Sequence, residues 1–149
     1  MKTAEEYSVE SQKHIKEAEY LLNSTYSITK DQKVLLSILL KLHSALESSL
    51  NAFLNQKIGS RNTFLSKISL LREESKNLNL TETDFEFLTL LRNLIQEHQD
   101  SPVEFARKDK FIIADHQFSL HTLSIQNLNE YLQISKKIIA ELLMNIKGD

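Results

Sequence analysis

An arginine, an asparagine and a histidine (Arg92, Asn93 and His98) lie together in an otherwise apolar stretch of the chain. An arginine can neutralise a phosphate through several fixed N–H donors, and a histidine can transfer a proton near neutral pH. These are the two groups that cleavage of a phosphodiester without a metal requires. The spacing alone is weakly specific, because the chain has five histidines to combine with its arginines. Whether this spacing indicates a catalytic site therefore depends on the helices and loops that carry these residues.

Other kinds of catalytic or metal site have less support. A di-iron bundle needs Glu-x-x-His pairs, and no histidine of the chain has a glutamate three residues before it. Phosphate-binding loops and glycine-flanked serine nucleophiles need several glycines, and the chain has two. Cysteine chemistry is excluded because the chain has no cysteine. Asp115, His116 and His121 could hold a metal, but they fall in a predicted loop with no further ligand. We therefore assign no metal and no cofactor.

The composition predicts an all-α protein. Its 149 residues suit one domain over 1–149, and two glycines and one proline are too few for a turn-rich β protein. The net charge of −2 gives no overall attraction to nucleic acid, so any RNA contact would be local. The first residues lack the apolar core of a signal peptide, and no apolar run approaches the roughly 20 residues of a membrane span. We expect a cytoplasmic protein without a membrane segment.

Apolar residues at spacings of three and four predict an up-and-down bundle of about five helices. The predicted ranges are about 4–22, 34–54, 63–76, 82–98 and 124–147. Start signals for four of them are Thr3, Thr29, Thr81 or Thr83, and Thr122 or Ser124, and the third helix fits from Thr63. The first helix should end at residues 23–25, the fourth near His98 before Pro102, and Gly59 and Gly148 should cap the second and the last.

A small β-hairpin is predicted between the last two helices. Residues 103–107 and 110–114 alternate apolar and polar side chains and are rich in β-branched and aromatic types. Arg107, Lys108 and Lys110 are interleaved with Phe105 and Phe111, an arrangement that could face nucleic acid. Glu104, Asp109 and Asp115 oppose those charges, which favours a solvated hairpin.

The second and fourth helices each carry a second apolar stripe. Leu36, Leu40 and Leu54 form one, and Phe87, Leu90 and Leu94 form the other. The second helix is therefore expected to be central in the fold or buried in a subunit contact. In a simple bundle one side of the fourth helix would lack cover, and a second copy of the chain is the simplest partner. A regular helix would also place His98 about 240° around from Arg92. The two can therefore meet at one phosphate only if the helix unwinds before His98 or if a second subunit contributes one of them.

Arg92-Asn93 followed by His98, late in a core helix of a small helical protein, resembles the HEPN (higher eukaryote and prokaryote nucleotide-binding) domain. That family has an arginine, commonly followed by a polar residue such as asparagine, and then a histidine after four to six intervening residues. The segment His43–Leu54 resembles the family's second helix, and Glu17–Leu22 its first. The similarity covers nearly the whole chain as an order of helices, but only Arg92, Asn93 and His98 are specific. The hairpin and the five-residue gap depart from the commoner pattern.

The resemblance implies a homodimer whose Arg–His motifs face each other across a cleft. It implies a metal-independent endoribonuclease, often a toxin whose antitoxin is a minimal nucleotidyltransferase. His98 would then be the general base or acid for attack by the 2′-hydroxyl, and Arg92 would stabilise the phosphorane. Asn93 would position the phosphate or hold the motif, and Glu47 is assigned to orient His98 or Arg92. The alternative is a non-catalytic interaction or nucleotide-binding module that docks a partner protein such as that nucleotidyltransferase.

Overall fold

The computed structural model describes residues 2–58 and 63–146. Its helices are α1 (Ala4–Tyr20), α2 (Tyr26–Thr29), α3 (Lys33–Leu54), α4 (Phe64–Glu74), α5 (Glu82–Asp100) and α6 (Ile125–Met144), and its strands are β1 (Val103–Arg107), β2 (Lys110–Ala114) and β3 (Leu120–Leu123). This order confirms the predicted helical bundle with a small sheet before the last helix. Gly59 and Gly148, predicted as helix caps, lie outside the described residues. None of the described helices is both long and apolar enough to cross a membrane.

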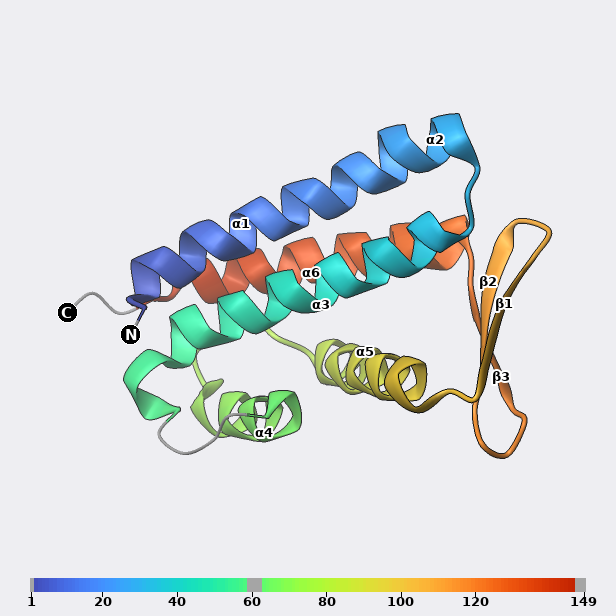
Figure 1. Ribbon diagram of the computed structural model, residues 1–149. Coiled ribbons are helices and arrows are strands. Elements are labelled where there is room, and N and C mark those ends of the chain that lie inside the picture. Colours follow the sequence, from blue (N-terminus) through green and yellow to red (C-terminus); the bar gives the residue numbers. More distant parts are fainter. Residues whose placement is uncertain (1, 59–62, 147–149) are drawn as a thin grey trace.

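The helices form two layers (Figure 1). α1, α3 and α6 run side by side, α4 and α5 cross them on one face, and the sheet closes one end. α3 packs against α1 and α6 in its own layer and contacts α4 and α5 of the other, and most of its large apolar side chains are inaccessible to solvent. The fully buried ones are Leu35, Ile38, Leu39, Leu42, Leu46, Leu50 and Leu54. This central position explains why α3 is apolar on more than one side.

The second apolar stripe of α5 is also covered mostly within the chain. Phe87 and Leu94 are 5% and 6% exposed, and the Phe87 ring packs against Tyr131 of α6 with centroids 5.4 Å apart. Leu40 of α3 and Leu90 of α5 remain 38% and 43% exposed. Most of each stripe is therefore covered within one chain. The sequence pattern alone indicates a greater need for a second copy.

Most predicted helix starts are confirmed by their capping bonds. Thr3 Oγ1 accepts the N–H of Glu6, and Thr63 Oγ1 accepts that of Ser66. Reciprocal capping boxes join Thr81 to Asp84 before α5 and Ser124 to Asn127 before α6. Each cap satisfies N–H groups that the first helical turn leaves without a partner.

The predicted end of the first helix at residues 23–25 is wrong. The helix continues through a π-helical turn, Leu21–Thr25, into α2 and stops at Lys30, whose φ of 53° is left-handed. Leu22 and Tyr26 are both buried, so tertiary packing outweighs the weak helix preference of the intervening polar residues. The predicted capping box at Thr29 is wrong as well. Thr29 Oγ1 donates to the carbonyl of Thr25, and Asp31 Oδ1 accepts the N–H of Lys33 at the start of α3.

The hairpin is extended by a third strand, so the sheet order is β1-β2-β3 with both pairs antiparallel. The sequence pattern predicts a loop and a helix start here, because the four residues Leu120–Leu123 are few and do not alternate apolar and polar side chains. Glu104, Ile113 and His121 are register partners and therefore project from the same face of the sheet. Ile113 is fully buried, so this inner face is the one that packs on the helices.

Candidate functional site

His98 lies at the end of α5 and is held by a carboxylate of the sheet. Its Nδ1 is 2.6 Å from Oε2 of Glu104, and both side chains are about three-quarters buried, with exposed fractions of 26% and 24%. Ser101 fixes the connection, because its Oγ is within hydrogen-bond distance of the carbonyls of Val103 (2.7 Å) and Ala114 (2.6 Å). A carboxylate on Nδ1 sets the tautomer and ring orientation and leaves Nε2 as the atom that can accept a proton.

Arg92 and Asn93 lie on a different part of the α5 surface. Nη1 of Arg92 donates to Oδ1 of Asn93 at 3.2 Å, so the amide holds one edge of the guanidinium. Among the described residues no carboxylate forms an ion pair with Arg92. Asn93 also lines a hollow of about 360 Å³ beside Leu90 and Arg72. An arginine without an acidic partner is available to bind an anion such as a phosphate.

The structure does not bring Arg92 and His98 together within one chain. α5 is helical through Asp100, two residues past the predicted end, so it does not unwind before His98. The step of six positions from Arg92 to His98 corresponds to about 240° of helical rotation. Leu91 and Ile95, which are buried, lie between the two side chains around the helix. Of the two routes that would let Arg92 and His98 share a phosphate, only a contribution from a second subunit is compatible with this helix.

Glu47, assigned to orient His98 or Arg92, contacts neither of them. Its Oε2 is 3.5 Å from Nζ of Lys67 on α4, whose side chain is 8% exposed. One turn earlier on α3, the ring of His43 packs against Phe64 with centroids 4.5 Å apart. Burial lowers the pKa of His43, an effect that Glu47 opposes and Lys67 reinforces. These contacts join α3 to α4 and give both residues a structural role.

A second polar cluster lies beside the first. Glu97 of α5, Asp115 after β2 and His121 of β3 place one ligand atom each within 4.8 Å of one another. The sequence grouped Asp115 and His121 with His116, which is exposed instead. Two carboxylates and an imidazole suit a divalent ion such as Zn²⁺. Asp115 already has internal partners, however: Oδ1 accepts the N–H groups of Gln117 and Ser119, and Oδ2 lies 3.3 Å from His121 Nε2.

The hydrogen bonds of Asp115 explain the cluster without a metal. Although burial alone would raise it, the pKa of Asp115 is lowered by the backbone of Ser119 and by His121. The carboxylate thereby closes the turn between β2 and β3, as Asx side chains commonly do. We base no function on this cluster.

Glu104 is the residue that sequence reasoning missed. It was counted only as a charge that offsets the basic residues of the hairpin. The sequence holds only a weak signal for it: Pro102 turns the chain directly after the helix of His98. The strand alternation misleads, because it places the apolar Val103 and Phe105 on the face expected to be buried and Glu104 on the other.

Comparison with known proteins gives no identification. No family model, no curated protein and no solved structure matches the chain. The similarity to the HEPN domain therefore rests on Arg92, Asn93 and His98 and on the order of the helices, and it stays a prediction.

Proposed function

We propose that the chain is a HEPN-like helical domain that cleaves RNA without a metal, acting as a homodimer. The observation that carries the proposal is the pair formed by His98 Nδ1 and Glu104 Oε2 at 2.6 Å. A histidine oriented by a carboxylate is the arrangement that general base catalysis uses repeatedly. The second support is Arg92, a partly buried arginine with an amide partner and no ion pair among the described residues.

The proposed reaction uses the 2′-hydroxyl of the RNA as the nucleophile. Nε2 of His98 takes the proton of that hydroxyl, whose oxygen attacks the adjacent phosphorus. The N–H groups of Arg92 stabilise the charge of the phosphorane, and Asn93 holds the guanidinium in place. The bond from phosphorus to the 5′-oxygen then breaks, and the histidinium returns the proton to that oxygen. The products are a 2′,3′-cyclic phosphate and a 5′-hydroxyl.

The divergence of Arg92 and His98 on α5 gives the proposal a testable geometry. Each reacting phosphate must contact Arg92 of one protomer and His98 of the other. In a two-fold dimer this arrangement creates two equivalent composite sites. A heterodimer of Arg92→Ala and His98→Ala chains would contain one intact site and one site that lacks both groups.

Subunit mixing tests this directly. Each variant alone should lose cleavage of a mixed RNA pool in EDTA. Co-refolding the two at equal amounts should restore about a quarter of the wild-type rate, because half of the dimers carry one of two sites. Mixing His98→Ala with Glu104→Ala is the matched control and should restore nothing, because both changes affect the same half-site. A chain that stays monomeric at working concentration, or mixing without recovery, contradicts the composite site.

The second candidate is a non-catalytic module that docks a partner protein. The observation in its favour is the exposed apolar surface left on three helices, at Leu40, Leu65 and Leu90. A partner such as a minimal nucleotidyltransferase, or a bound nucleotide, would fit this alternative. Absence of cleavage by the wild-type protein over a range of salt and pH would favour it over the ribonuclease.

A further inference from the structure

The outer face of the sheet carries an exposed aromatic ring beside a group of cations. Phe105, Ile112 and Thr122 are register partners across the three strands, and Arg107 pairs with Lys110 at the hairpin end. All five alternate with the inner-face residues Ile113 and Leu123 and so lie on the opposite face of the sheet, where Ile112 itself is buried. Phe105 remains 39% exposed.

Most of the acidic residues close in sequence to these cations contact other parts of the structure. Among the described residues, Arg107, Lys108 and Lys110 form no ion pair. Glu104 projects from the opposite face and contacts His98. Asp115 is engaged with its turn and with His121, so only Asp109 stays beside the three cations. The net charge of the hairpin end is therefore positive.

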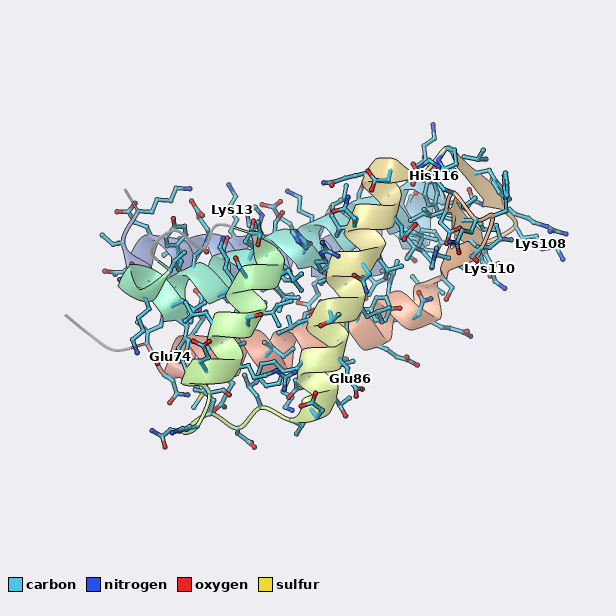
Figure 2. The ribbon with its side chains drawn as sticks, turned by 90° about the horizontal axis from the view of Figure 1, so that it is seen from below. Lys13, Glu74, Glu86, Lys108, Lys110 and His116 are labelled. Carbon is cyan, nitrogen blue, oxygen red and sulfur yellow. The ribbon has the colours of Figure 1, made fainter. Side chains whose placement is uncertain are left out.

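Arg107 and Lys110 lie directly opposite each other on neighbouring strands. Like charges in this position repel each other and weaken the strand pair, so an anion between them would be stabilising. Together with Lys108, Ile112 and Thr122 they line a hollow of about 250 Å³. Figure 2 shows Lys108 and Lys110 at the outer end of the sheet.

The hollow is held in place by the helices. The side-chain amide of Gln32 donates to the carbonyl of Lys108, and the Tyr26 hydroxyl is 3.5 Å from the carbonyl of Asp109. The two bonds fix the hairpin turn to α2 and to the segment between α2 and α3. A surface ordered before binding loses less entropy when a ligand arrives.

We propose that this outer face binds single-stranded RNA. Phosphates occupy the hollow between Arg107, Lys108 and Lys110, and a base stacks on Phe105. Every base can stack on an aromatic ring, and every phosphate is attracted to a fixed cation. Binding to this surface therefore does not require a particular RNA sequence. RNA as the ligand, and not DNA, rests on the function proposed above.

The test is binding of a fluorescently labelled 12-nucleotide RNA, followed by anisotropy in EDTA. Every protein carries His98→Ala so that no RNA is cleaved. Arg107→Gln with Lys110→Gln should weaken binding at least about tenfold and reduce the salt slope of log K by about 1.4, because two single-strand phosphate contacts are lost. Phe105→Leu should weaken binding about tenfold and leave the salt slope unchanged.

The matched control removes two charges elsewhere. Lys13 and Lys16 of α1 line a separate hollow of about 530 Å³ beside Tyr20. Lys13→Gln with Lys16→Gln should change RNA affinity less than twofold. Loss of binding in this variant and not in the sheet variants, with all of them folded by circular dichroism, overturns the proposal. Tighter binding of an acidic peptide of equal charge than of the RNA also overturns it, in favour of a protein partner.

The two proposals can fail separately. If the wild-type protein cleaves no RNA but its RNA binding depends on Arg107, Lys110 and Phe105, the sheet proposal stands and the ribonuclease proposal fails. If cleavage requires His98 while all sheet variants bind RNA like the wild type, the ribonuclease stands and the sheet proposal fails.

Discussion

Replacing Asp84 should loosen the start of α5, the helix that carries Arg92 and His98. Asp84 is 4% exposed, and its Oδ2 is 2.9 Å from the backbone nitrogen of Thr81 and 2.7 Å from Nζ of Lys137 on α6. Although burial alone would raise it, the Lys137 ammonium and Thr81 hold the pKa of Asp84 below its ordinary value. The carboxylate thus closes the capping box of α5 and ties that helix to α6.

The magnitude follows from these two bonds. The bond that returns to Thr81 contributes about 1 kcal/mol, as helix caps commonly do. The bond from Lys137 contributes about 1 kcal/mol, because the lysine side chain is half exposed and solvent weakens the pair. Asp84→Ala should therefore cost about 2 kcal/mol, or about 4–8 °C in Tm for a chain of this size. Asp84→Asn keeps an oxygen for Thr81 and should cost about half as much.

Urea denaturation followed by circular dichroism measures these differences, since the chain has no tryptophan for fluorescence. A double-mutant cycle of Asp84→Asn with Lys137→Met should give a coupling energy of about 1 kcal/mol. Lys136→Met is the control, because Lys136 pairs on the surface with Glu19 and should cost less than about 0.5 kcal/mol. A loss below about 0.5 kcal/mol for Asp84→Ala, or a coupling energy near zero, would refute the reasoning.

Two further predictions concern the contact between α3 and α4. Burial lowers the pKa of His43 below 6.5, so the unfolded chain binds this proton more readily than the folded one. The free energy of unfolding should therefore be highest above pH 6.5 and decrease as the pH drops below that value. His43→Phe, which keeps a ring against Phe64, should reduce this decrease. Urea denaturation at a series of pH values measures it. The exposed His116→Gln should leave the fall unchanged, and a wild-type curve that is level between pH 7 and 5 would contradict the assignment. Glu47→Gln leaves the buried ammonium of Lys67 without its ion pair and should cost about 1 kcal/mol while RNA cleavage by the folded variant persists; a folded variant without cleavage would return Glu47 to the catalytic site.

The helices could be predicted from the sequence because their signals are local. The caps at Thr3, Thr63, Thr81 and Ser124 depend on neighbours three residues away, and the apolar spacing of each helix needs no knowledge of the others. Where burial decides, the sequence pattern fails. Leu22 and Tyr26 keep the first helix intact across a polar triplet, because both are buried against other elements.

The candidate site also combines features that the sequence predicts with features that depend on tertiary contacts. The types and spacing of Arg92, Asn93 and His98 are readable, and so is their separation around a regular helix. The partner of His98 is not, because Glu104 reaches it only through the strand register and the turn at Pro102. The distribution of charge over the two faces of the hairpin is not readable either, since the contacts that hold Glu104 and Asp115 away from the outer face are tertiary.

Cleavage of a mixed RNA pool by the purified protein in EDTA tests the central claim most directly. We expect the wild-type protein to cut RNA to 2′,3′-cyclic phosphate ends. We expect no cleavage by His98→Ala or by Arg92→Ala, each with the wild-type circular dichroism spectrum. Cleavage that survives either substitution, or a wild-type protein that cuts no RNA at any salt or pH tested, would contradict it.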